Sequence, residues 1–184
     1  MPKGRTVALP STPSLPRWLR AELRSDHAGE TGAVWLYLGL KQCSRDRAVI
    51  EFAESHLETE RAHLNLFEQW LDTADKSLLI PLWRLAGWAL GAIAALGGPN
   101  MVYVTVSAVE TFVVAHYGDQ IKALERSRLY PEVAELLKRF NADENLHQAE
   151  AEERVVLQEN AAMHVWRALI TTGSALAVKA ARRI

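Results

Sequence analysis

Cysteine is almost absent from the chain: Cys43 is the one cysteine among 184 residues. This excludes an intrachain disulfide framework and any Cys-rich zinc or iron–sulfur site, so metal chemistry here must use histidine and carboxylate side chains. An excess of either charge is also lacking, because 21 Lys and Arg residues stand against 22 Asp and Glu residues. This balance gives no support to a protein that binds nucleic acid regardless of its sequence.

Glycine and proline are few, with ten and seven residues, and their clustering leaves long stretches free for helix. Apolar residues between the clusters recur at spacings of three and four, as on one face of a helix. No strand pattern with turn dipeptides is present. The sequence therefore predicts an all-α protein with helices over 18–43, 46–73, 101–128, 132–160 and 162–182.

The first part of the chain differs from the rest. Four of the seven prolines lie within the first 16 residues, and proline disfavours helix at its own position and at the preceding one. We therefore predict an extended N-terminal arm over 1–17 and one domain over 18–184. The arm is basic, like an organelle transit peptide, but its prolines break the amphipathic helix that such a signal needs. Because no secretory hydrophobic region is seen there, we expect a location on the cytosolic side of a membrane.

Carboxylates and histidines form a repeated pattern. The motif Glu-x-x-His occurs twice, and such a pair places both side chains on one face of a helix. A lone glutamate precedes each pair, by 30 residues in the first copy and by 34 in the second. The candidate ligands are Glu30, Glu60, His63, Glu110, Glu144 and His147.

This repeat has a physical meaning. Two antiparallel helices joined by a short loop bring residues about thirty apart opposite each other, and two such hairpins would surround one cavity with four carboxylates and two imidazoles. That is the ligand set of a dinuclear iron or manganese site in a ferritin-like four-helix bundle. The alternative is that these are surface residues of amphipathic helices. It fits poorly at Glu110, which is the only Asp, Glu, Lys or Arg between Ser107 and Tyr117, because a lone carboxylate in an apolar run is expected to be buried and to need a partner.

Several blocks of sequence resemble one family. Residues 26–33 read Asp-His-Ala-Gly-Glu-Thr-Gly-Ala, and later blocks are Pro81-Leu82-Trp83, residues 87–91 (Gly-Trp-Ala-Leu-Gly), Ala108-Val109-Glu110 and His116-Tyr117. In order and spacing they are similar to the demethoxyubiquinone hydroxylases, the di-iron quinol hydroxylases of ubiquinone biosynthesis. The resemblance runs from about Arg20 to the C-terminus.

The resemblance implies an activity and a cofactor. The chain would be a monooxygenase that uses dioxygen and two iron ions to hydroxylate the ring of a demethoxyubiquinol-type polyprenyl benzoquinol. The six candidate ligands would hold iron, with Glu60 and Glu144 as the bridging carboxylates. The resemblance also implies a homodimer and association with other quinone-biosynthesis proteins.

Further residues are expected around the ligands. Asp143 precedes Glu144 and would accept a hydrogen bond from the free N–H of His63, thereby fixing its tautomer; the alternative is a solvated helix residue. His147 would instead pair with Asp26 or with His56.

Tyr117 is a candidate for a catalytic role. It follows Glu110 by seven residues on the same helix face, so it would contact substrate or relay a proton or electron, unless it is an ordinary packed tyrosine. His27 and His116 are displaced from the ligand face of their helices and are expected to be structural.

An apolar segment over about 78–98 bears on the partners. Between Ser77 and Val109 the only charged residue is Arg84. Leu78–Leu96 approaches the roughly 20 residues that span a bilayer, but its proline, glycines and arginine favour an interfacial hairpin at a membrane surface. The last helix ends in basic residues, which suits anionic lipid. Packing into a dimer or into the bundle is the alternative.

These features predict a peripheral membrane protein. The expected place is the cytoplasmic face of a bacterial inner membrane, with the matrix side of the mitochondrial inner membrane as the alternative. Two other functions compete with the monooxygenase. One is ferritin-like iron oxidation or storage, which does not explain the apolar segment. The other is a non-catalytic quinone-binding subunit of a biosynthetic complex, which does not explain six ligand-type residues.

Overall fold

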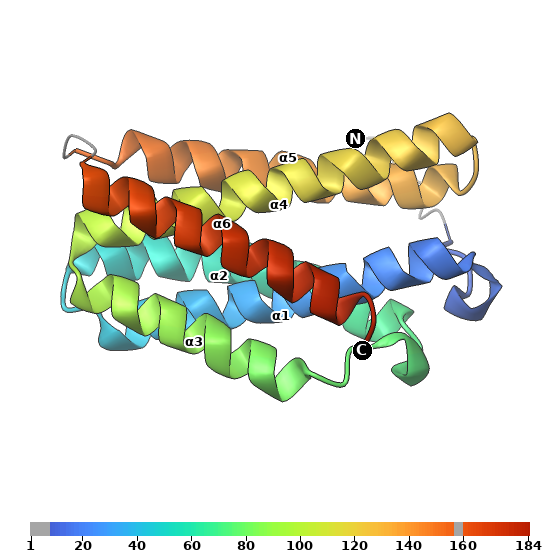
Figure 1. The fold of residues 1–184 in the computed structure, drawn as a ribbon, viewed down its shortest axis with the longest axis horizontal. Helices are drawn as coiled ribbons and strands as arrows, with labels where there is room; N and C mark the ends of the chain where they lie inside the picture. The colour runs from blue at the N-terminus through green and yellow to red at the C-terminus, as the bar shows by residue number, and fades with distance from the viewer. Residues whose placement is uncertain (1–7, 157–159) are drawn as a thin grey trace, which may run out of the picture.

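The protein is all-α, as predicted. The structure, a computed structural model, describes residues 8–156 and 160–184, and within them it contains six α-helices and two short 3₁₀ turns but no strand (Figure 1). The elements are η1 (Thr12–Ser14), α1 (Arg17–Cys43), α2 (Arg47–Trp70), η2 (Thr73–Asp75), α3 (Ile80–Leu96), α4 (Pro99–Ser127), α5 (Pro131–Glu153) and α6 (Ala161–Ala181).

The helix ends have local causes. Asp46 caps α2 by accepting a hydrogen bond from the backbone N–H of Val49 at 3.1 Å, and Asn160 caps α6 through Met163 at 3.0 Å. Pro99 and Pro131 stand in the first turns of α4 and α5, where the missing N–H costs nothing. Helix α5 ends at Glu153, so the predicted helix over 132–160 is too long, and its residues 157–159 lie outside the described residues.

The described part of the N-terminal arm packs against the bundle. Residues 1–7 lie outside the described residues, whereas 8–16 include the turn η1. The indole N–H of Trp70 donates to the carbonyl of Pro10 at 2.7 Å, and Leu15 is buried. These contacts hold the arm against the end of α2.

Helices α1, α2, α4 and α5 form two antiparallel hairpins. In the first, Lys41 of α1 pairs with Glu54 of α2, while nearer the other end His27 reaches Glu68. In the second, the hydroxyl of Ser107 on α4 donates to Glu152 of α5, and Lys138 pairs with Glu125 near the opposite end.

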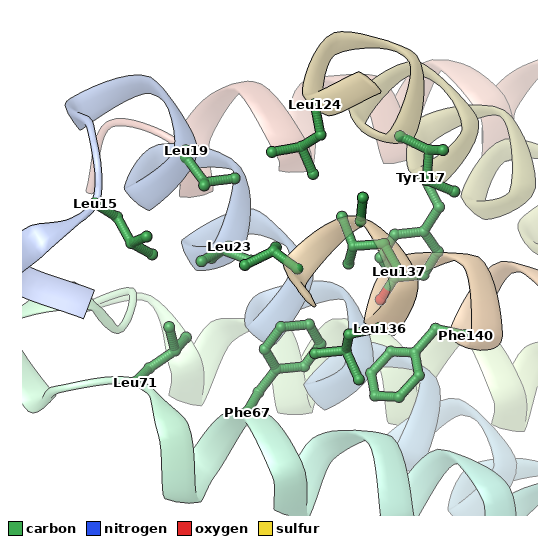
Figure 2. Packing of buried hydrophobic residues seen from close by; sticks show 13 residues of the cluster. Leu15, Leu19, Leu23, Phe67, Leu71, Tyr117, Leu124, Leu136, Leu137 and Phe140 are labelled. Atoms are coloured by element: carbon green, nitrogen blue, oxygen red, sulfur yellow. The ribbon is translucent and has the colours of Figure 1, made fainter. Parts of the chain in front are cut away.

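The bundle has two apolar clusters with a polar zone between them. One cluster is drawn in Figure 2 and includes Leu19, Leu23, Phe67, Leu124, Leu136, Leu137 and Phe140. The other includes Leu36, Tyr37, Leu40, Val49, Phe52, Val102, Tyr103 and Val106. Each of the four helices contributes to both clusters, so each passes through the middle of the bundle with its remaining buried residues. Those middle residues include the predicted ligands.

Helix α3 lies along α1 at backbone distance. A Cβ on Gly87 would collide with the carbonyl oxygen of Gly32, and one on Gly91 would collide with that of Leu36. Because residue numbers increase in the same direction along both helices in these two contacts, α3 runs parallel to α1. The segment is therefore one continuous helix of 17 residues that packs on the bundle, and the expected interfacial hairpin is wrong in its local structure.

Helices α3 and α6 also present apolar side chains to solvent. Both lie over the same side of the bundle, with α6 in red and α3 in green (Figure 1). Exposed large apolar residues on or beside these two helices are Leu78, Leu82, Leu85, Ile93, Leu96, Val165, Leu169, Leu176 and Ile184. By length and composition α4 is the one described helix able to cross a membrane, and half of the relevant window is buried inside the protein.

Candidate metal centre

All six predicted ligands meet in the polar zone between the two clusters. They come one or two from each helix of the bundle, and their exposed fractions range from 1% to 7%. The members are Glu30 on α1, Glu60 and His63 on α2, Glu110 on α4, and Glu144 and His147 on α5.

The six residues divide into two overlapping groups of four. In the first, ligand atoms of Glu30, Glu60, His63 and Glu144 all lie within 4.8 Å of one another. In the second, ligand atoms of Glu60, Glu110, Glu144 and His147 do so within the same limit. Glu60 and Glu144 belong to both groups. They therefore occupy the places where a carboxylate can bridge two metal ions, with one imidazole and one further carboxylate on either side.

Hydrogen bonding within the protein does not satisfy this centre. Oε2 of Glu30, Oε1 of Glu60, Oε1 of Glu144 and Nδ1 of His63 are buried without a well-directed hydrogen bond from any described residue. Imidazole nitrogens nevertheless lie close, with Nδ1 of His63 3.1 Å from Oε1 of Glu144 and Nδ1 of His147 3.0 Å from Oε1 of Glu60. Buried polar atoms without hydrogen bonds reduce the stability of the folded protein, and bound cations would satisfy them.

The electrostatics of the centre also favour bound cations. Burial and the charge of Glu144 raise the pKa of both Glu60 and Glu110 well above its ordinary value. Burial also disfavours the charged form of Glu144, but the adjacent imidazoles of His147 and His63 outweigh it and lower the pKa of Glu144 to about 2. Burial lowers the pKa of His63, yet Glu144 and Glu30 bring it to about 11. The metal-free centre must therefore hold extra protons, which divalent cations would replace.

The residue types suit two metal ions of the iron and manganese kind. Carboxylate and imidazole ligands are those that these metals accept, and four carboxylates balance the charge of two divalent ions. The orphaned atoms, the donor set and the overlap of the two groups all fit a dinuclear centre.

Two tyrosines donate hydrogen bonds to Glu30 and Glu110, the terminal glutamates, each of which belongs to only one of the two ligand groups. Each tyrosine lies on a different helix from the glutamate that it contacts. The hydroxyl of Tyr117 on α4 donates to Oε1 of Glu30, and the hydroxyl of Tyr37 on α1 donates to Oε1 of Glu110 at 2.8 Å. Sequence reasoning singled out Tyr117 but missed Tyr37. The signal was present, because Tyr37 follows Glu30 by seven residues just as Tyr117 follows Glu110.

The neighbours expected for the histidines are found in part. Nε2 of His63 lies 3.1 Å from Oδ2 of Asp143, which is the expected pair. Of the two residues expected to pair with His147, His56 lies beside it, with the two rings stacked and their centroids 4.2 Å apart rather than joined by a hydrogen bond. Asp26 is not its partner. Because Asp26 lies one turn before Glu30, towards the other end of α1, its carboxylate accepts from Gln120 at 2.7 Å instead.

His56 links the centre to the surface. Its Nδ1 lies 3.0 Å from the hydroxyl of Tyr37, and its Nε2 lies 3.0 Å from Oε2 of the half-exposed Glu150. Burial and the charge of His147 lower the pKa of His56 to about 4. A chain of contacts therefore runs from Glu110 through Tyr37 and His56 to Glu150.

The two histidines expected to be structural differ from each other. His27 is buried and its Nε2 lies 2.9 Å from Glu68, away from the centre. His116 instead lies in the wall of the main cavity, with Nε2 3.2 Å from Oδ1 of Asp26.

An apolar cavity of about 660 Å³ reaches the centre from the side of α3 and α6. Its walls include Trp83 and Leu90 of α3 and Trp166 and Leu169 of α6, and Glu30, Glu60, Glu110 and Glu144 lie at its inner end. A second hollow of about 500 Å³ opens between α2 and α5 beside His63, Arg139 and Asp143. The centre thus has an apolar approach and a polar one.

Comparison with known proteins adds independent findings. The family model described as ubiquinone biosynthesis protein COQ7 matches residues 17–181. The NADPH-dependent 3-demethoxyubiquinone 3-hydroxylase, mitochondrial, of Homo sapiens is 34% identical over 129 residues, which cover 68% of this chain and 59% of that protein. The 3-demethoxyubiquinol 3-hydroxylase of Rhodospirillum rubrum is 38% identical over 127 residues, which cover 66% of this chain and 60% of that protein. The matched region thus spans about three fifths of these relatives.

Proposed function

Because the chain belongs to the family of the ubiquinone biosynthesis protein COQ7, we propose that it hydroxylates the ring of a demethoxyubiquinol-type polyprenyl benzoquinol with dioxygen. One observation carries the proposal: an apolar cavity of about 660 Å³ leads from α3 and α6 to four buried glutamates. A cavity of this kind suits a hydrophobic substrate whose reacting ring must meet a metal centre. The names of the human and Rhodospirillum relatives, both 3-hydroxylases of this compound class, support it.

Two iron ions are the proposed cofactor. Glu60 and Glu144 would bind both ions, Glu30 and His63 would complete one site, and Glu110 and His147 would complete the other. Bound iron would supply the activation of dioxygen that delivers one oxygen atom to the ring.

The surrounding residues orient the ligands and exclude water. The tyrosine hydroxyls of Tyr37 and Tyr117 each hold one oxygen of a terminal glutamate, which directs the other oxygen towards the centre. Asp143 fixes the ring of His63. The apolar walls keep bulk water from the reacting ring, which protects it from side reactions.

The substrate is proposed to enter from a membrane. Because α3 and α6 line the cavity and also carry most of the exposed leucines, a polyprenyl tail can leave the cavity between them and stay in lipid. We place the protein on the cytoplasmic face of a bacterial inner membrane or on the matrix side of the mitochondrial one. Association with a second copy of the chain or with other quinone-biosynthesis proteins is part of the same proposal.

The two other functions account for fewer features. Iron oxidation or storage requires no apolar cavity beside the ligands, and a quinone-binding scaffold requires no set of six buried ligands. Neither has an observation in its favour that hydroxylation does not also explain.

Mass spectrometry of the product tests the proposal. Iron-loaded protein is incubated with a demethoxyubiquinol, NADPH as reductant and isotope-labelled dioxygen. We expect one labelled oxygen atom in the ring of the product. Consumption of dioxygen with the quinol unchanged would contradict the proposal in favour of iron oxidation, and iron binding without any consumption would favour the scaffold.

A further inference from the structure

His116 is a polar residue of the cavity wall that is not part of the metal centre. It lies on α4 six residues after Glu110, and its ring lines the cavity together with Asp26 of α1. Asp26 stands one turn before Glu30 on the same helix, and such a pair projects side by side. A group bound at His116 would therefore lie one helical turn from the metal ligands, a spacing that one benzoquinol ring can bridge.

The contacts of His116 favour one position for its ring proton. Nε2 lies 3.2 Å from Oδ1 of Asp26 and 3.3 Å from Oγ of Ser25, whose hydroxyl already donates to the carbonyl of Glu22 at 2.7 Å. The amide group of Gln120 donates one hydrogen to Asp26 at 2.7 Å, and its nitrogen also lies 3.1 Å from Nε2. The carboxylate of Asp26 can only accept, and a hydrogen bond to a charged group is stronger than one from a neutral amide, so Asp26 favours the proton on Nε2. In the neutral ring Nδ1 is then an acceptor, and no described residue hydrogen-bonds it, so it is left to an occupant of the cavity.

Buried charge around His116 favours its protonated form. Burial by itself lowers the pKa of His116, but the carboxylates of Asp26 and Glu22 outweigh this and raise it above the ordinary value. The charge of Arg182, the residue that follows α6, lowers the pKa of His116 again, although this arginine is itself paired with Glu22 at 2.6 Å. Asp26 has 3% exposure, and its Oδ2 accepts no hydrogen bond from the part of the chain that the structure describes. The cavity thus contains an imidazole whose positive charge is stabilised in advance.

We propose that His116, held by Asp26, binds a ring hydroxyl of the quinol through Nδ1 and accepts its proton during the reaction. In this step the O–H bond breaks, its electron pair stays on oxygen, and an N–H bond forms at Nδ1. The ring becomes a phenolate and therefore more electron-rich for hydroxylation, while Asp26 balances the imidazolium. The same proton returns to the oxygen of the product. This inference rests on the proposed function, and it assigns to His116 a role that sequence reasoning did not.

Binding to the metal-free protein tests the inference without turnover. Trp83 and Trp166 line the cavity, so quenching of tryptophan fluorescence under anaerobic conditions reports occupancy. The probes are a short-chain demethoxyubiquinol and its dimethyl ether, which cannot donate a hydrogen bond. We expect the wild-type protein to prefer the quinol by about tenfold, the value of one buried hydrogen bond. His116→Phe should abolish this preference, and His164→Phe, at an exposed position of α6, should keep it.

The pH dependence separates proton acceptance from simple packing. Protonated Nδ1 cannot accept, so quinol binding should weaken as the pH falls through the pKa of His116. Asp26→Asn removes a stabilising charge and should move this midpoint to lower pH. His116→Gln keeps an acceptor oxygen, so the quinol should still bind, but the midpoint should vanish.

The binding results separate a failure of the His116 assignment from a failure of the proposed hydroxylation. If His116→Phe weakens the quinol and the ether equally, or weakens neither, the assignment of His116 is wrong, while labelled oxygen in the product would still support the proposed hydroxylation. If the wild-type protein binds neither probe, the substrate class itself is wrong and both proposals fall.

Discussion

Single residues matter most where charge is buried. The six candidate ligands are almost inaccessible to water, and an ionised group in such a place needs a partner of opposite charge. Glu144 is the member on which the others depend, since Nδ1 of His63 and Nδ1 of His147 lie 3.1 Å and 3.2 Å from its two oxygens. Removing a shared carboxylate should therefore affect both metal positions together.

Glu144→Ala and Glu60→Ala are expected to reduce bound iron from two ions per chain to one or none. The reason is that each variant lacks a carboxylate common to both ligand groups. Iron content is measured by elemental analysis after reconstitution, with Glu135→Ala as the control because Glu135 is an exposed residue of the same helix as Glu144. Two ions per chain in either variant would contradict the assignment.

Tyr117→Phe should leave iron binding intact and slow turnover. The ring still packs against Phe140, but the hydroxyl that holds Oε1 of Glu30 is gone, so the ligand is less well oriented. A loss of a buried hydrogen bond to a charged group corresponds to about tenfold or more in rate when it acts in the transition state. Steady-state kinetics with equal iron content measures it, and unchanged turnover would mean that Tyr117 only packs.

His56 is expected to make the metal-free protein less stable in acid. Its folded pKa is about 4 against 6.5 for the free side chain, so the unfolded state takes up a proton first as the pH falls. The stability that neutral His56 contributes is thus complete above pH 6.5 and lost between 6.5 and 4, by about 3 kcal/mol.

Denaturant unfolding of the wild type and His56→Leu over this pH range isolates the effect. The free energy of unfolding should fall less steeply with decreasing pH in His56→Leu than in the wild type. His164→Leu should behave like the wild type because His164 is exposed. Parallel curves for the wild type and His56→Leu would refute this prediction.

Among the elements, α3 has the most demanding packing. It touches α1 at backbone level through Gly87 and Gly91, although the middle of a helix is a position where glycine costs stability. The close approach explains these glycines, because a side chain would push α3 away from α1. Since α3 forms one wall of the cavity, the same contact helps to set the width of the cavity.

Gly91→Ala is expected to destabilise the protein by about 1–3 kcal/mol, the usual cost of overpacking. The added Cβ would overlap the carbonyl oxygen of Leu36. Gly118→Ala is the matched control, since a Cβ added there would meet, among the described residues, no atom within 4 Å beyond its own chain neighbours and helix backbone, and the better helix former should stabilise α4 by about 0.5–1 kcal/mol. Chemical denaturation compares the two, and equal effects of both changes would contradict the packing argument.

For the molecule as a whole, the distribution of apolar surface suggests a membrane-facing side. Most of the exposed leucines lie on α3 and α6, which also form the outer walls of the cavity. A 17-residue helix such as α3 is about 25 Å long, shorter than the hydrocarbon core of a bilayer. Contact with one leaflet is therefore the arrangement that we propose.

Liposome flotation should detect this contact. The double variant Leu85→Gln with Leu169→Gln should lower the membrane partition coefficient by about tenfold. The reason is that two exposed leucine side chains, which would be partly buried in lipid, are lost. Leu146→Gln removes an equally exposed leucine from α5 and should have little effect. If the wild-type protein does not float with anionic vesicles, with or without quinol, the membrane proposal is withdrawn.

The sequence by itself determined the helical class, the family resemblance and the six candidate ligands. Helix periodicity is a local property, and the spacing of Glu30, Glu60 and Glu110 along the chain is a property of the sequence that folding does not alter. The Glu-x-x-His pairs are local too, because two residues three apart always share a helix face. Breaks at short polar stretches and at glycine and proline located most of the predicted helix ends within a few residues of the observed ones.

Only the tertiary structure decided which residues meet across helices. Asp26 was expected near His147 as an alternative to His56, but the antiparallel register of α1 and α4 brings it to Gln120 and His116. The packing of α3 on α1 depends on glycines from both helices, so the composition of the segment alone suggested a membrane hairpin instead. Tyr37 and His116 acquire their roles from contacts with helices distant in the chain. The sequence pattern specifies which side chains lie on each face of a helix, whereas the register and rotation of the helices decide which other residues those side chains contact.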